Sequence, residues 1–185
     1  MMDEEPSIEL EEEQHPVAST EAIAQAMFLC GQFTTQIFMA DTKAAVTLGG
    51  AAVLATVATL DTQLLSRLFD PSGTPLERLR AVLVLVMFGL LLWSVANALI
   101  STLPATPRPK HTNLFYFVSI RDMTEEAYRK AFLKQTPQEV EAALFNQVHI
   151  LAGITYHKFA LVRRGLYLLV TAFTIWLLIH LLLVF

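Results

Sequence analysis

The chain is poor in cysteine and in charged residues. Its single cysteine, Cys30, excludes an internal disulfide framework and a cysteine-based zinc site. Charged residues make up 16% of the sequence and apolar residues 54%, whereas soluble domains carry about 25% charged and about 45–50% apolar residues. This balance indicates a membrane protein, and the length of 185 residues indicates one domain.

The sequence also lacks the motifs of common enzymes. It contains no glycine-rich phosphate loop after a strand, no His-Glu-x-x-His motif and no Ser/His/Asp set in one plausible cleft. We therefore expect a protein that is not an enzyme and that has no catalytic residue, no cofactor and no metal site.

Basic residues are missing from the start of the chain. Residues 3–13 hold seven Asp and Glu side chains without a basic partner, and the rest of the chain carries ten acidic and thirteen basic residues. Because like charges repel and no apolar face is present, residues 1–18 are predicted to form a disordered acidic tail. We expect this tail to be dispensable for membrane insertion and assembly.

Three stretches are long and apolar enough to cross a bilayer, which takes about 20 residues. They are residues 44–60, 79–103 and 165–185. The first is rich in Ala, Gly and Thr, so it is expected to pack inside a bundle, with a buried soluble helix as the alternative. Small side chains recur in it every four residues, a spacing that lets membrane helices approach closely: Ala45 and Gly49, then Ala51, Ala55 and Thr59. Leu91 in the second span is placed towards lipid.

The parts outside the spans are predicted to be helical. Residues 19–43 should form a cytoplasmic helix that continues into the first span, and residues 44–104 a transmembrane hairpin. In the region 105–164, Thr124 and Thr136 are candidate N-caps of two helices, the second of which merges with the last span. The aromatic segment 113–120 looks extended or strand-like. The predicted fold class is an all-α membrane protein of three transmembrane helices with helical cytoplasmic extensions, possibly with a short strand after the second span.

The distribution of Lys and Arg predicts the orientation. Residues 105–164 contain nine basic residues, and residues 61–80 contain three. Because cytoplasmic loops carry an excess of Lys and Arg, the region 105–164 and the N-terminus are expected in the cytoplasm. His180, inside the last span, is expected to face the bundle interior, either as a neutral ring bonded to a neighbouring helix or in a pore or proton role.

Polar and aromatic side chains gather next to the cytoplasmic ends of all three spans. Lys and Arg suit a phosphate, aromatic rings stack on a base, and Asn can hydrogen-bond to a base. The same residue types also occur as ordinary interface anchors, and Asp41 and Lys158 could simply pair to hold the mouth of the bundle together. The predicted ligand-binding residues are Asp41, Lys43, Asn113, Phe115, Phe117, His149, Lys158 and Arg163.

Three segments resemble the transmembrane effectors of bacterial Pycsar anti-phage systems. They are Asp41-Thr-Lys-Ala-Ala-Val-Thr-Leu48, Asn113-Leu-Phe-Tyr-Phe117, and His149 followed by Lys158 and Arg163-Arg164, and the resemblance covers residues 32–185. It implies an effector in the bacterial inner membrane that senses cyclic CMP or cyclic UMP and, as a homo-oligomer, damages that membrane to halt the infected cell. The implied partners are the nucleotide, the lipid bilayer and further copies of the chain, and no nucleic acid polymer. The alternative function is a membrane anchor or scaffold whose helices recruit a cytoplasmic protein.

Overall fold

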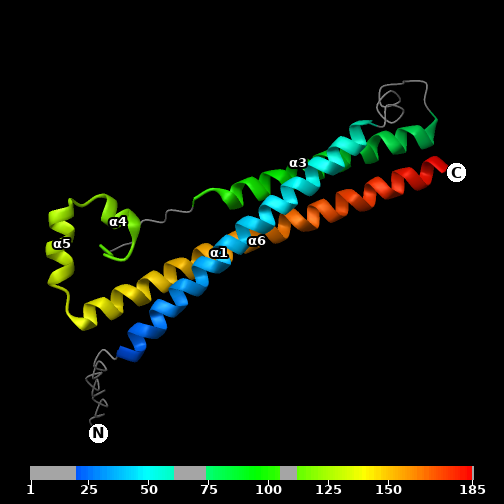
Figure 1. The fold of residues 1–185 in the computed structure, drawn as a ribbon. Helices are drawn as coiled ribbons and strands as arrows, with labels where there is room; N and C mark the ends of the chain where they lie inside the picture. Colours follow the sequence, from blue (N-terminus) through cyan, green and yellow to red (C-terminus); the bar gives the residue numbers. More distant parts are fainter. Residues whose placement is uncertain (1–19, 61–73, 105–111, 185) are drawn as a thin grey trace, which may run out of the picture.

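The computed structural model describes residues 20–60, 74–104 and 112–184, so the acidic tail lies outside the described residues. Three long helices form a bundle, and two short helices lie beside the start of the last one (Figure 1). The long helices are α1 (Thr20–Leu60), α3 (Pro75–Thr102) and α6 (Pro137–Val184), and the short ones are α4 (Phe117–Arg121) and α5 (Glu125–Leu133). The predicted all-α membrane fold is confirmed.

The strand considered after the second span is wrong for the residues that the structure describes. Residues 114–116 form a turn, and Phe117 begins helix α4. Helices α3, α5 and α6 each begin with a threonine cap. Thr74 and Glu77 form a capping box in front of α3, and the Thr124 hydroxyl accepts the backbone N–H of Ala127 at 3.2 Å. The candidate N-cap Thr136 forms a capping box with Glu139 at the start of α6, in which the Thr136 N–H donates to the Glu139 carboxylate at 2.7 Å.

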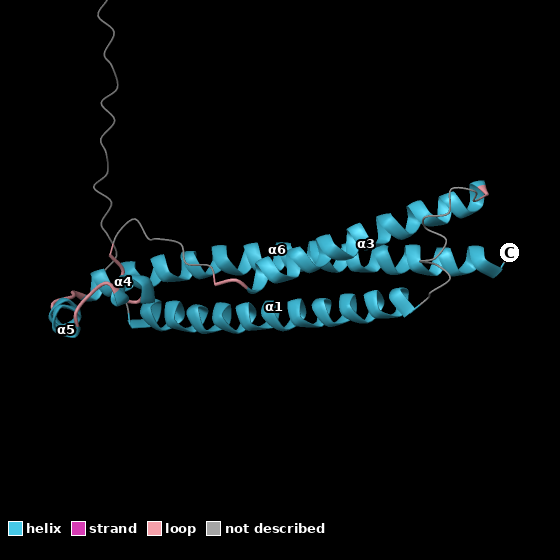
Figure 2. Ribbon diagram, turned by 90° about the horizontal axis from the view of Figure 1, so that it is seen from above, coloured by secondary structure: helices cyan, strands magenta, loops and turns pink. Residues whose placement is uncertain are grey.

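The three long helices differ in length, so only part of α1 and α6 can pack against α3. α1 has 41 residues, α6 has 48 and α3 has 28, and at a rise of about 1.5 Å per residue α1 and α6 are each about 60–70 Å long. A hydrocarbon core is only about 30 Å thick. α1 and α6 run in the same direction, α3 runs against them, and α3 ends about halfway along both (Figures 1 and 2). The first halves of α1 and α6 therefore extend together beyond the three-helix part.

Small and aliphatic side chains fill the interior of the three-helix part. Its main cluster joins all three helices and consists of Ala51, Leu54, Ala58, Met87, Leu91 and Ala172. At one crossing of α3 and α6 the Ser94 hydroxyl donates to the Gly165 carbonyl oxygen at 2.7 Å, and a Cβ atom on Gly165 would lie 3.3 Å from the Ser94 carbonyl oxygen. Glycine at this position lets the two backbones approach.

Two predicted orientations in the spans differ from the structure. Leu91 is 3% exposed and belongs to the core, so its placement towards lipid is wrong. In the first span Ala51 is buried and Ala55 packs against the core, whereas Ala45 and Gly49 are exposed on another face. The two sets of small residues therefore differ in what they face: Ala51 and Ala55 pack inside the chain, and Ala45 and Gly49 lie on its surface.

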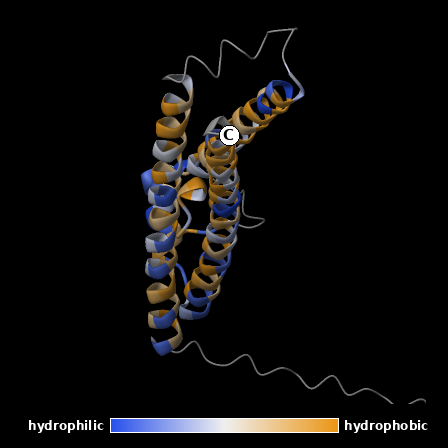
Figure 3. Cartoon of the chain, turned by 90° about the vertical axis from the view of Figure 1, so that its right-hand side faces the viewer, coloured by the Kyte–Doolittle hydropathy of each residue, from blue (hydrophilic) through white to orange (hydrophobic). Residues whose placement is uncertain are grey.

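The outside of the bundle is apolar. Leu92, Trp93, Tyr167 and Val170 are among the exposed large side chains, and apolar residues (orange) recur along the long helices in Figure 3. Each long helix contains a window long and apolar enough to cross a membrane. A surface of this kind is stable in lipid or against other apolar helices.

Candidate functional site

The predicted ligand-binding residues lie at two levels of α6. We call the level of Asp41, Lys43, Lys158 and Phe159 the neck, because α3 ends there, and we call residues 112–146 the head. Both levels are built from α6 together with a segment that is distant in the sequence.

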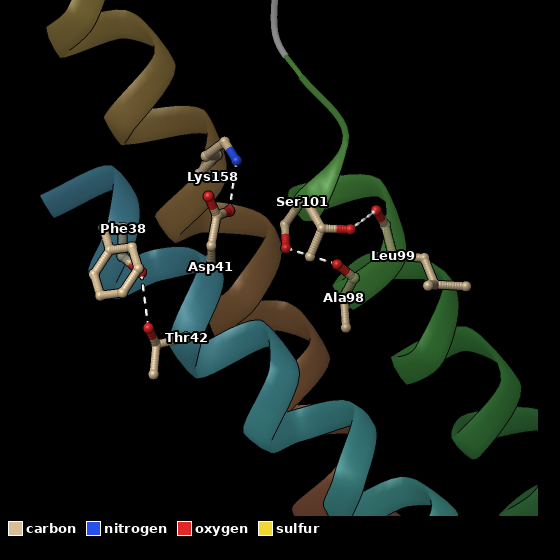
Figure 4. A network of polar contacts seen from close by, with 8 residues as sticks. Phe38, Asp41, Thr42, Ala98, Leu99, Ser101 and Lys158 are labelled. Carbon is tan, nitrogen blue, oxygen red and sulfur yellow. Dashed lines mark hydrogen bonds and ion pairs between the residues drawn. The ribbon is translucent and has the colours of Figure 1, made fainter. Parts of the chain in front are cut away.

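A buried ion pair joins α1 to α6 in the neck. The Lys158 Nζ atom lies 2.5 Å from an Asp41 carboxylate oxygen, and the two side chains are 7% and 38% exposed (Figure 4). Figure 4 also places Ser101, at the end of α3, beside this pair. A buried ammonium group is tolerated only with a partner, so the contact fixes the lateral position of α1 on α6. The pairing that the sequence offered as the alternative to ligand binding is therefore present.

Lys43 provides a second contact between the same helices. Its Nζ atom lies 5.3 Å from the centre of the Phe159 ring, within the range of a cation–π interaction. Lys43 itself is exposed and lies two residues after Asp41, directly before the proposed first span. Asp41 and Lys43 thus both contact α6 at neighbouring positions, Lys158 and Phe159.

In the head, Asn113 fastens the segment after α3 to α6. Its buried amide nitrogen donates to the Ala143 carbonyl oxygen at 3.0 Å and to the Asn146 side-chain oxygen at 3.3 Å. Its side-chain oxygen accepts the Phe115 N–H at 2.9 Å. This last bond closes an Asx turn, which is why the chain bends here and does not continue as a strand. Both amide hydrogens of Asn113 are engaged by protein acceptors.

The aromatic side chains of the head mostly pack against one another. The Phe115 ring meets the Phe132 ring of α5 edge-on, with 6.0 Å between centres. Tyr116 is buried next to Phe117, burial raises the pKa of its phenol, and its hydroxyl has no hydrogen-bond partner among the described residues. Phe117 is 57% exposed. Of these rings, Phe117 offers the most free surface for stacking.

The eight residues do not converge on a single level. Asn113 contacts α6 at Ala143 and Asn146, and Lys158 lies twelve residues beyond Asn146, which is about 18 Å along a helix. His149 and Arg163 are exposed on α6. The sequence predicted that these side chains gather next to the ends of the spans. The structure instead spreads them along the head and the neck, because α6 continues unbroken through both. Ligand binding by the individual residues stays a prediction.

A cavity of about 610 Å³ lies in the head between the end of α5, the first turns of α6 and the segment before α4. Its polar lining residues are Thr112, Asn113, Lys134, Gln135, Glu139 and Asn146. The side-chain oxygen of Gln135 is buried and has no hydrogen-bond partner in the described part of the chain. Of these six residues, sequence reasoning named only Asn113 as a candidate. Lys134 and Glu139 lie at helix ends, where a charged residue is common and does not by itself indicate a cavity.

No metal centre is visible in the ranges 20–60, 74–104 and 112–184, where no three His, Cys, Asp or Glu residues gather as a ligand set. In the last span, the Nδ1 atom of His180 lies 3.0 Å from the carbonyl oxygen of Trp176 on the same helix. The candidate site is therefore sought among the polar side chains of the neck and the head.

Comparison with known proteins gives one match. The family model described as the Pycsar effector protein domain matches residues 25–185, which include the neck, the head and all three long apolar helices. No curated protein and no solved structure matches the chain.

Proposed function

The chain belongs to the family of Pycsar effector proteins, membrane effectors of anti-phage defence, and we propose that it senses a cyclic pyrimidine nucleotide and impairs the bacterial inner membrane as a homo-oligomer. The observation that carries this proposal is the extent of the family match. It includes the head as well as the spans, so the part outside the membrane belongs to the same functional unit as the apolar helices.

The packing of the three-helix part supports action as an oligomer. Its main core cluster is apolar and is filled by side chains such as Leu54, Met87 and Leu91, which leave little room for water within one chain. A water-filled opening would therefore have to form between copies of the chain. The exposed apolar faces of the long helices are available both to lipid and to other copies.

The distribution of basic residues supports a head that faces the cytoplasm. Nine Lys and Arg residues lie in 105–164, against three in 61–80. A nucleotide made by a cytoplasmic cyclase would then meet the head directly. We also propose that the effector is not an enzyme, because the sequence offers no catalytic motif and the polar residues that line the cavity are amides, one threonine and two single charges.

The proposal is tested in bacteria that carry this effector together with an inducible pyrimidine nucleotide cyclase. A dye that reports membrane potential should show depolarisation and growth should stop only when both proteins are present. The matched control is a cyclase variant that makes no product. Unchanged potential in the presence of the nucleotide, or depolarisation that does not depend on the cyclase, would contradict the proposal.

A scaffold is the second candidate, and one observation favours it. Met27, Phe28, Phe38 and Met39 are exposed on the first half of α1, in the part proposed to lie outside the membrane. Apolar side chains in water often mark a protein contact. A scaffold would keep the membrane potential constant in the experiment above while a protein partner followed the effector to the membrane.

A further inference from the structure

We propose that the head cavity, and not the neck, is the binding site of the cyclic pyrimidine nucleotide. This inference rests on the proposed function and adds the position of the site and the role of each polar residue in it. The cavity volume of about 610 Å³ falls within the range of about 300–1,000 Å³ that is usual for small-molecule sites. In the neck, the Lys158 ammonium group is buried against Asp41 and is already neutralised by this carboxylate, so it is not free to bind a phosphate.

The charges around the cavity fit a cyclic mononucleotide. Lys134, at the end of α5, is exposed and makes no ion pair with any residue of the described ranges, so its ammonium group is available to a phosphate monoanion. The only carboxylate in the lining belongs to Glu139, and it already accepts the Thr136 N–H at 2.7 Å at the start of α6. The positive end of the α6 dipole offsets its charge. Its remaining lone pairs suit a ribose 2′-hydroxyl, a common partner of acidic side chains in nucleotide sites.

The amide side chains of the cavity fit the edge of a pyrimidine. The buried Gln135 oxygen has no partner, and an unsatisfied buried acceptor is costly until a donor reaches it. Both the amino group of cytosine and the N3–H group of uracil are such donors. Asn146 accepts one bond from Asn113 and makes no described contact through its own amide nitrogen, which can donate to a base carbonyl oxygen. Asn113 is a positioning residue here, because its amide hydrogens are already used.

The place of the cavity in the fold explains how binding could reach the membrane. Helix α5 has no buried residue and is held in part by the contact of Phe132 with Phe115. A ligand bound between Lys134 or Gln135 on one side and Asn146 on the other would fix the end of α5 against α6. Because α6 is one continuous helix from Pro137 to Val184, any displacement of its first turns is passed on to the neck and the last span.

Calorimetry on the full-length, detergent-solubilised protein with cyclic CMP and cyclic UMP tests this assignment. Lys134→Ala removes the cation and Ala142→Trp fills the cavity, since Ala142 is exposed on its wall. Each change should weaken binding at least about tenfold. The matched controls are Lys130→Ala, one turn before Lys134, and Gln138→Trp, one turn before Ala142 on α6, and neither residue lines the cavity. Both controls should bind within about twofold of wild type, and all four proteins should keep the oligomer and thermal unfolding profile of wild type.

The outcomes separate this inference from the proposed function. If wild type binds a pyrimidine nucleotide and both cavity variants bind equally well, the site lies elsewhere, so the inference is overturned while the proposed function stands. If the cavity variants and the controls lose binding to the same extent, the cavity is not the site either. If wild type binds neither nucleotide, the inference and nucleotide sensing fail together.

Discussion

At the residue scale, Asp41 and Lys158 form a pair whose two members are unequally buried. The Lys158 side chain is 7% exposed and that of Asp41 38%. Removing Asp41 leaves an ammonium group buried without a partner, whereas removing Lys158 leaves a carboxylate that water can still reach. Loss of one partner of a buried pair costs about 3–5 kcal/mol, and replacement of both by neutral groups costs far less.

We therefore expect Asp41→Ala to lower the thermal stability of the solubilised protein more than Lys158→Met does. The double variant should recover most of the loss, as a double-mutant cycle by thermal unfolding would measure. If the losses of stability from the two single changes simply add in the double variant, the interaction between Asp41 and Lys158 contributes nothing to stability. A larger loss from Lys158→Met would contradict the assignment by burial.

Tyr116 has a buried hydroxyl with no partner in the described residues, so Tyr116→Phe should keep or slightly raise stability near neutral pH. Burial raises the pKa of this phenol above its ordinary value of 10.0. Because the folded state then disfavours the charged form, the contribution to stability is complete below pH 10.0 and is lost as the pH rises through the higher folded-state pKa. Wild type should thus lose more thermal stability in alkali than Tyr116→Phe. Identical alkaline profiles would exclude this account of Tyr116.

The sequence predicted which polar residues matter better than it predicted what they contact. Asn113 and Lys158 were both chosen as candidates, and both are buried. The pairing of Lys158 with Asp41 was offered by the sequence as the alternative to ligand binding. The partners of Asn113, however, were not predicted, because Ala143 and Asn146 lie 30 and 33 residues away. No local pattern reports contacts over such separations. The cavity was missed for the same reason, because its walls come from three segments.

At the scale of helices, Gly165 lies at a close contact between two helices, whereas Gly153 lies on an open surface. A Cβ atom on Gly165 would meet the Ser94 carbonyl oxygen at 3.3 Å, whereas on Gly153 it would meet nothing within 4 Å. Alanine is favoured over glycine in a helix by about 0.8–1 kcal/mol. Gly153→Ala should therefore raise the thermal stability of the solubilised protein, and Gly165→Ala should raise it less or lower it. An equal gain from both changes would show that α3 and α6 do not approach closely at Gly165.

Gly49 lies on the outer face of α1, where a Cβ atom would meet nothing within 4 Å. Gly49→Leu should leave the stability of the single chain unchanged and should reduce chemical crosslinking between copies, if this face packs against another subunit in the proposed oligomer. Ala51→Leu is the matched change on the inner face and should lower stability by about 1–3 kcal/mol through overpacking. If Gly49→Leu crosslinks to the same extent as wild type, this face of α1 is not the contact between copies.

The long helices were predictable because their signals are local. Apolar runs, capping residues and the absence of proline predict α1, α3 and α6 within a few residues, and α3 simply begins earlier, at the capping box of Thr74 and Glu77. The run of aromatic residues at 115–117 favours a strand by propensity. There the Asx turn at Asn113 and the packing of Phe115 on α5 decide the conformation, and neither is a matter of propensity.

At the scale of the whole molecule, the head is at the same end of the bundle as the start of α1, and α6 runs from the head through the neck to the far end (Figure 1). The proposed function therefore assigns sensing and membrane impairment to two ends of one helix. It also makes the response depend on the side of the membrane from which the nucleotide arrives.

Current recording across a planar bilayer that holds the purified protein tests this claim most directly. An antibody to a tag at the amino end identifies the side on which the head lies. Cyclic CMP or cyclic UMP added on that side should produce a current that cyclic AMP does not, and the same nucleotide added on the opposite side should have no effect. A bilayer that stays silent with both pyrimidine nucleotides on the head side, or that conducts equally from either side, would contradict the account.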